Sequence, residues 1–291
     1  MSSDIMPMTE PRPRRQRSQD SGAADAALLF DEPGPRGRIL IAIGSVVAVI
    51  GIAALAAAVL YRLDLAGQLD YPKWRYFLGQ SVVSQLLEAA GTTLTLGGVA
   101  AVLTFPLGIA LGWLRLLDNR PIKWLVGLWV DAMRAVPMLL LVYFFLLLVP
   151  RFATISDFWK LALPIVMCTS ATTAEVFRSG VRALDRGQTE AAWALGMSPS
   201  LTMRLILAPQ ALRLMLPTLI TQMVTIIKGT TLAYVLAYPE LMYRGSTMIG
   251  QAKIDAHLSV FFQTYVIIAL LYIIVNWSLG ALARYIESRT R

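Results

Sequence analysis

Apolar residues dominate the chain in long unbroken runs, not in short alternating segments. A helix needs about 20 apolar residues to cross roughly 30 Å of hydrocarbon. A spanning β-barrel would show segments of about ten residues with alternating hydrophobicity, which are not visible here. The pattern predicts an all-α polytopic membrane protein with about six transmembrane helices, near residues 39–60, 88–113, 122–149, 159–177, 212–237 and 258–283.

The fourth of these segments, 159–177, has the weakest hydrophobic signal. It contains Pro164 and a run of small or hydroxylated residues at 169–173. Such residues suit close packing between membrane helices, because they let the backbones approach one another. We therefore expect this span to pack against other helices instead of lipid.

The first 38 residues differ in composition from the rest of the chain. They are rich in Pro, Arg, Ser, Asp and Gly and include the basic run 11–17. This composition predicts a disordered tail. The apolar stretch 39–60 is longer than the core of a signal peptide, which has about 7 to 15 residues, so we expect a retained membrane anchor.

Positive charges are distributed unevenly between the two sides that these spans define. Most of the 26 Lys and Arg residues fall in the tail, around the loop between the second and third spans, in the connection 178–211 and at the C-terminal end. These segments all lie on one side of the membrane. Lys and Arg are enriched in cytoplasmic loops. Both termini are therefore predicted to be cytoplasmic, and residues 61–87 to form a periplasmic loop.

The remaining composition excludes several kinds of site. Cys168 is the only cysteine and His257 the only histidine. No intrachain disulfide can form, and neither a metal site nor a Ser/His/Asp triad is expected. The topology pattern accounts for the net charge of +8, so nucleic acid is not expected as a partner.

The connection 178–211 is too long for a simple turn between neighbouring helices. Residues 187–195 favour a helix that Gly196 would end, and residues 201–207 can form a second short helix. Pro209 is expected to break the pattern before the next span. The pattern predicts a helix, a glycine turn and a helix on the cytoplasmic face, a shape suited to a groove of another protein.

The spacing in this connection resembles the Glu-Ala-Ala loop in membrane subunits of binding-protein-dependent ABC importers. The spaced matches are Glu190, Ala191, Ala192, Gly196, Ile206 and Pro209. Flanking stretches are similar to the polar amino acid branch of that family, at 91–94, 134–137, 175–180, 187–188, 209–211, 216–217 and 228–232. The resemblance covers about residues 85–285 and implies a permease domain at 88–285, to which the helix at 39–60 is additional.

The resemblance implies a division of labour among several subunits. The chain has no Gly-x-x-x-x-Gly-Lys-Ser/Thr phosphate loop, so we expect no cofactor in this subunit and no enzymatic activity of its own, with ATP used by a partner. The implied partners are two cytoplasmic ATPase subunits, a second membrane subunit that is a copy or a homologue, and a periplasmic binding protein. The implied function is import of a polar amino acid across the bacterial inner membrane, with glutamate, aspartate or glutamine favoured.

The resemblance assigns the ATPase contact to Gly187, Gln188, Glu190, Ala191, Ala192, Gly196 and Pro209. Glu190 would offer a charged contact, and Gly196 would allow the tight turn. Ala191 and Ala192 would keep the helix slim enough to insert into a groove. The alternative for Glu190 is a solvated helix charge, and the surrounding pattern favours the ATPase contact.

Lys228 interrupts an apolar span, where an unpaired charge costs several kcal/mol, so it should face protein or a water-filled path. One hypothesis is that the substrate supplies a carboxylate to Lys228 on the substrate path, with hydroxyl contacts from Thr230 and Thr231. The other is a structural ion pair with Glu175 or another acidic residue. Both hypotheses stay open at this point.

Three further residues carry smaller predictions. Glu175 and Arg178 lie one helical turn apart and are expected to form a local ion pair at the entry to the connection. Glu240 follows Pro239 and is a candidate contact for the binding protein.

An ion-gradient-driven secondary transporter or channel is the alternative function, but it commonly shows internal repeats and several intramembrane acids, which are not evident here.

Overall fold

The computed structural model describes residues 34–290, which are almost entirely helical, with no strand in that range. The chain divides into two units, Met1–Ala66 and Gly67–Arg291. Four described helical stretches are long and apolar enough to cross a membrane, and a bent pair raises the number to five. The four are Pro35–Leu65, Gln80–Leu114, Pro199–Leu236 and Phe261–Leu282. The prediction of an all-α membrane protein is confirmed.

The described part of the first unit is the helix α2 (Pro35–Leu65). Pro35 lies in the first turn, where its missing N–H has no intrahelical partner to lose. None of the residues of α2 is buried, and a helix that is apolar all round is typical of a lipid environment. The helix covers the predicted span 39–60. Of the predicted tail, 35–38 belong to α2, and residues 1–33 lie outside the described residues.

In the second unit, α4 (Gln80–Leu114) packs along α7 (Asp157–Arg182). Glycines permit this close approach, because a Cβ atom at Gly108 would lie 2.5 Å from the Cβ of Thr173. The hydroxyls of Thr104 and Thr169 hydrogen-bond across the two helices at 2.7 Å. More residues are buried in α7 than in α4. The prediction that the fourth span packs against helices agrees with this arrangement.

The predicted span 122–149 is not one continuous helix. The structure has α5 (Arg120–Ala135) and α6 (Met138–Leu147), followed by the short helix η2 (Val149–Arg151), with a bend of 96° between α5 and the α6–η2 segment. Pro137 lacks an N–H and disfavours helical geometry in the residue before it. Val136 is accordingly extended, with φ −78° and ψ 129°. The proline therefore breaks the segment between an α5 that carries charged residues and an α6 that is entirely apolar.

The predicted loop 61–87 is largely helical. Two short helices, α3 (Tyr71–Arg75) and η1 (Tyr76–Leu78), precede α4, which begins at Gln80 and not at residue 88. The indole N–H of Trp74 donates to the carbonyl of Gln68 at 3.2 Å. The first two turns of α4 are too polar to register as a span, but they pack through buried residues such as Val82 and Leu86.

Pro209 does not end a helix as predicted. The chain continues without a break through α9 (Pro199–Thr202), the π-helical turn η3 (Met203–Leu207), α10 (Ala208–Gly229) and the 3₁₀ segment η4 (Thr230–Leu236). Proline conflicts sterically with the carbonyl four residues before it. The wider π turn that precedes Pro209 accommodates this conflict.

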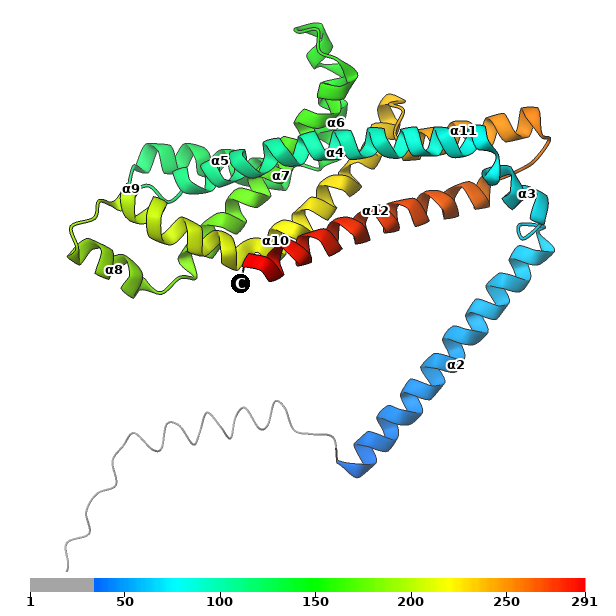
Figure 1. Ribbon diagram of the computed structural model, residues 1–291, viewed down its shortest axis with the longest axis horizontal. Helices are drawn as coiled ribbons and strands as arrows, with labels where there is room; N and C mark the ends of the chain where they lie inside the picture. The colour runs from blue at the N-terminus through cyan, green and yellow to red at the C-terminus, as the bar shows by residue number, and fades with distance from the viewer. Residues whose placement is uncertain (1–33, 291) are drawn as a thin grey trace, which may run out of the picture. The chain divides into compact units, whose positions relative to one another are not determined.

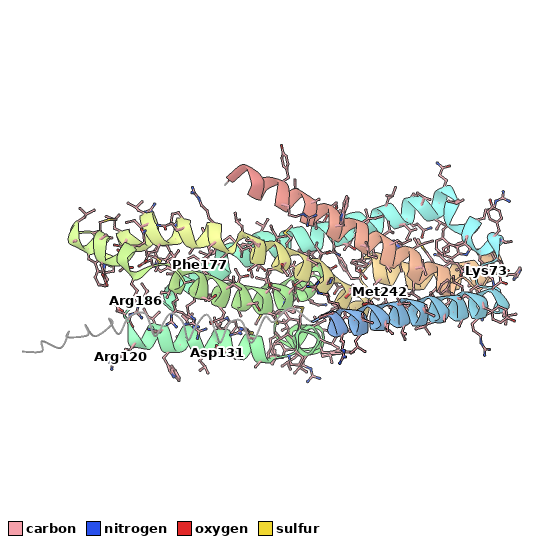
Figure 2. All side chains as sticks on the ribbon, turned by 90° about the horizontal axis from the view of Figure 1, so that it is seen from below. Lys73, Arg120, Asp131, Phe177, Arg186 and Met242 are labelled. Carbon is pink, nitrogen blue, oxygen red and sulfur yellow. The ribbon has the colours of Figure 1, made fainter. Side chains whose placement is uncertain are left out.

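The second unit has two ends that matter for function. After η4 come α11 (Leu241–Asp255) and α12 (Phe261–Thr290), and α12 runs beside α10 (Figure 1). Figure 2 shows Arg120 and Arg186 at one end of this unit and Lys73 and Met242 towards the other. We call the end that carries Arg186 the coupling end and the opposite one the far end.

Candidate functional site: an exposed helix and a polar helix face

A short helix, α8 (Arg186–Ala194), projects at the coupling end (Figure 1). Its start is fixed by Asp185, whose side chain accepts a hydrogen bond from the N–H of Gly187 at 2.7 Å. Its end is a Schellman motif, in which the N–H of Gly196 donates to Trp193 O at 2.9 Å and that of Met197 to Ala192 O at 3.0 Å.

Gly196 occupies the left-handed region, with φ +77°. A Cβ at this position would meet no atom within 4 Å. The glycine is therefore required by the backbone conformation and not by crowding. This geometry agrees with the turn predicted at Gly196.

The exposed residues in and just after α8 include a carboxylate and two large apolar side chains. Glu190 and Ala191 are exposed, whereas Ala192 is buried against the bundle. Trp193 is 56% exposed and Leu195 is 82% exposed. Sequence reasoning missed these two side chains, although large apolar residues on a short projecting helix were a signal for a contact surface.

The other predicted contact residues tie α8 to the bundle. Gln188 accepts a hydrogen bond from Gln210, the neighbour of Pro209, at 3.5 Å. Pro209 itself is exposed. The helix packs against α9 and η3, and a cavity of about 240 Å³ separates it from the coupling end of α4 around Trp113. The structure thus places six of the seven predicted residues on α8 and the turn that follows it, and the seventh, Pro209, in the first turn of α10 beside Gln210.

A cluster of charges joins three helices beside this unit. Glu175 accepts hydrogen bonds from Arg178 on its own helix, at 3.0 Å from Nε, and from Arg115 at the end of α4, at 2.9 Å. Arg115 also lies 3.4 Å from Asp131 on α5, which is 3.9 Å from Arg134. The predicted pair of Glu175 and Arg178 is confirmed, and its extension to α4 and α5 was not foreseen.

One face of α10 is polar and exposed. It carries Thr218, Thr221, Thr225 and Lys228, spaced by three, four and three residues, so they share one face of the helix. The hydroxyls of Thr221 and Thr225 donate to backbone carbonyls one turn earlier, at 3.2 and 3.1 Å. Their lone pairs remain available as acceptors on the exposed face.

Lys228 is exposed and has no ion-pair partner among residues 34–290. Its predicted structural pair with Glu175 is wrong, because Glu175 is bound by Arg115 and Arg178. Thr231 is partly exposed and donates to Lys228 O at 2.8 Å. Thr230 is fully buried and donates to Ile227 O at 2.7 Å, so its hydroxyl does not lie on the face that carries Lys228.

Glu240 lies in a buried polar cluster instead of at the surface. Its exposed fraction is 0%, so the predicted contact with a binding protein is wrong. Its carboxyl group accepts from the N–H of Tyr243 at 2.9 Å and from the hydroxyl of Tyr272 at 2.8 Å. The N–H of Leu241 donates to the hydroxyl of Thr93 on α4 at 3.2 Å. These bonds fix the start of α11, and with it η4, to α4 and α12.

Comparison with known proteins places this architecture in a family. Residues 104–291 match the family described as binding-protein-dependent transport system inner membrane component. The chain is 34% identical over 230 residues to the glutamate transport system permease protein GluD of Corynebacterium glutamicum, covering 77% of this chain and 82% of GluD. It is 34% identical over 198 residues to the probable glutamine ABC transporter permease protein GlnP of Bacillus subtilis, covering 68% of this chain and 89% of GlnP.

The fold has solved counterparts. The structure superimposes on a crystal structure of an amino acid ABC transporter with histidines at a TM-score of 0.64 and 24% identity, covering 72% of this chain and 95% of that one. At this identity the likeness concerns the fold. Together with the match over residues 104–291, it leads to one conclusion: the chain belongs to the family of inner membrane components of binding-protein-dependent transport systems.

Proposed function

We propose that this chain is the membrane permease subunit of an ATP-driven importer for a polar amino acid of the glutamate or glutamine class. In this proposal α8 docks into a separate cytoplasmic ATPase subunit, and the polar face of α10 lines the substrate path. The names of the relatives GluD and GlnP support the substrate class. The excess of Lys and Arg at the coupling end supports a cytoplasmic location for α8 and for both termini.

The observation that carries the proposal is the exposed surface of α8. Glu190, Trp193 and Leu195 are exposed around a short helix that is held between a side-chain cap and a Schellman motif, so their positions are fixed before any partner binds. A rigid helix loses little conformational freedom on docking, which favours affinity. Because α8 follows directly on α7, a displacement of α8 acts on the tightly packed α4–α7 pair.

The polar face of α10 supports the substrate path. Lys228 and the three threonines would be costly against lipid tails, so this face requires a water-filled path or a second membrane subunit. The ammonium group of Lys228 can bind the α-carboxylate of an amino acid. The hydroxyl oxygens of Thr221 and Thr225 can accept from its α-ammonium group. Together they suit a zwitterionic substrate that carries both charges.

Charge reversal on α8 tests the coupling role. Glu190→Lys removes the carboxylate from an exposed position, so we expect normal insertion and folding but loss of co-purification with the cognate ATPase subunit. The matched control is Asp255→Lys, an exposed carboxylate at the far end, which should co-purify normally. ATPase recovery equal to wild type with Glu190→Lys would refute the docking role of this residue.

Removal of the charge at Lys228 tests the path. A hydrogen bond to a charged group contributes about 1.5–3 kcal/mol, so Lys228→Met should lower uptake efficiency about ten- to hundredfold in proteoliposomes that hold the whole transporter. Lys253→Met, which removes an exposed charge on α11, serves as the control. Unchanged substrate affinity and rate for Lys228→Met would rule out a substrate contact.

A further inference from the structure

An apolar groove opens between α4, α10 and α12 of the second unit. It has a volume of about 310 Å³ and is lined by Phe105 of α4, by Leu216, Leu219, Ile220 and Met223 of α10, and by Leu279 and Leu282 of α12. Each of these side chains is apolar. Each contributing helical stretch is long and apolar enough to cross a membrane, so the groove lies at a depth where hydrocarbon is the solvent.

The groove faces away from the proposed substrate path. On α10 its residues Leu216 and Met223 each lie two positions before a residue of the polar face, Thr218 and Thr225. Two residues correspond to about 200° around a helix. The groove and the polar face are therefore on opposite sides of α10, and a substrate in the path does not reach the groove.

The basic residue Arg213 lies on the same side of α10 as the groove residues. Arg213, Leu216, Ile220 and Met223 are spaced by three, four and three residues, so they form one stripe along the helix. Arg213 lies one turn nearer the coupling end than the groove. It is exposed and makes no ion pair within residues 34–290.

This order of groups, a cation at the membrane surface followed by an apolar groove, matches the order of groups in a phospholipid. On α4 and α12 the groove residues lie in the half of the helix nearest the coupling end, where α4 ends at Leu114, and on α10 the groove runs from Leu216, about two turns after the start at Ala208, past the middle of the helix. The cytoplasmic leaflet is rich in anionic lipids, and basic groups between helices on that side bind their headgroups.

We propose that this groove binds one acyl chain of an anionic phospholipid, whose phosphate is held by Arg213. The bound lipid stabilises the packing of α12 against α10 and α4 on the side opposite the path. The inference is independent of the ATPase partner and of the transported amino acid, because it concerns a different face of α10.

Native mass spectrometry of the purified full chain tests the proposal, with phosphatidylglycerol and phosphatidylcholine of equal chain length as probes. Wild type should retain phosphatidylglycerol in preference. Arg213→Gln should lower that retention about fivefold, the loss that corresponds to one cation at an anionic membrane surface. Met223→Trp, which fills the groove, should abolish retention of both lipids.

Two control variants make the same kinds of substitution, loss of a cation and addition of bulk, at positions outside the groove. Lys123→Gln removes an exposed cation at the coupling end, and Val102→Trp adds bulk to a residue of α4 that is 71% exposed and lies outside the groove. Both should retain phosphatidylglycerol as wild type does. Leu219→Ala, which widens the groove without adding bulk, should retain it at least as well as wild type.

Three outcomes would overturn the proposal. The first is equal retention of the two lipids by wild type, and the second is unchanged phosphatidylglycerol retention by a folded Met223→Trp variant. The third is a disulfide between two copies carrying Met223→Cys, because the groove would then face a second membrane subunit. Loss of transport through Glu190→Lys with normal lipid retention would leave this inference intact.

Discussion

The seam between α4 and α7 gives the sharpest structural prediction, because it rests on a single missing Cβ atom. At Gly108 an added Cβ would lie 2.5 Å from Thr173 Cβ, 2.7 Å from Thr173 Cγ2 and 2.8 Å from the carbonyl oxygen of Ser170. All three atoms belong to α7 and are held by its backbone. Gly108→Ala must therefore push the two helices apart.

The size of the effect follows from two opposing contributions. Overpacking of a well-packed seam costs about 1–3 kcal/mol, whereas replacing glycine by alanine inside a helix gains about 1 kcal/mol. Gly98→Ala on the same helix has only the gain, because no atom lies within 4 Å of its Cβ position. The two variants should therefore differ by about 1–3 kcal/mol, with Gly98→Ala the more stable.

Thermal unfolding of the two variants in the same detergent measures this difference. One kcal/mol corresponds to about 2–4 °C in proteins of this size, so Gly108→Ala should melt several degrees below Gly98→Ala. It should also lower transport by the assembled complex, since α7 leads directly to α8. Equal melting temperatures would show that α4 and α7 do not approach as closely as the structure indicates.

Three further predictions concern local features of the second unit. Glu175→Gln should lower the free energy of unfolding by about 2 kcal/mol, a value between those of exposed and buried ion pairs, because the paired side chains are only 15–23% exposed. The effects of Glu175→Gln and Arg115→Met should not add in a double-mutant cycle followed by melting. Additive effects would contradict the ion pair. Gly196→Val should cost about 1–2 kcal/mol of local stability, seen as faster hydrogen exchange at the end of α8, while Gly196→Asn should stay near wild type. Tyr272→Phe leaves one oxygen of the buried Glu240 without its hydroxyl donor, so the free energy of unfolding should fall by about 1–3 kcal/mol, and an unchanged melting temperature would argue against the bond.

Hydrophobicity and loop chemistry allowed much of the fold to be predicted from the sequence. The long apolar runs correspond to α2, α4, α10 with η4, and α12. The expectation of one continuous helix over 122–149 failed because hydropathy alone ignores Pro137. This proline holds Val136 in an extended conformation, and the helix breaks there. The prediction that Pro209 breaks the helix was wrong, because the π turn before it lets the helix continue past the proline.

The candidate site was predictable where its signal was local. The position of Gly196 at the end of α8 was predicted from turn chemistry, whereas the N-cap residue Asp185 was not named, although cap chemistry is a local signal too. The partner of Glu175 on α4 is 60 residues away, and no local pattern reveals a contact of that kind. Glu240 was misplaced for the same reason, because its burial depends on Tyr272 in a helix further along the chain.

Uphill uptake of a radiolabelled amino acid into proteoliposomes tests the central claim most directly, which is that α8 transmits motion from a separate ATPase. The account predicts uptake only when the cognate ATPase subunit, ATP and the binding protein are present together with this chain, and loss of uptake with Glu190→Lys. Accumulation against a gradient by this chain in the absence of an ATPase subunit would contradict it.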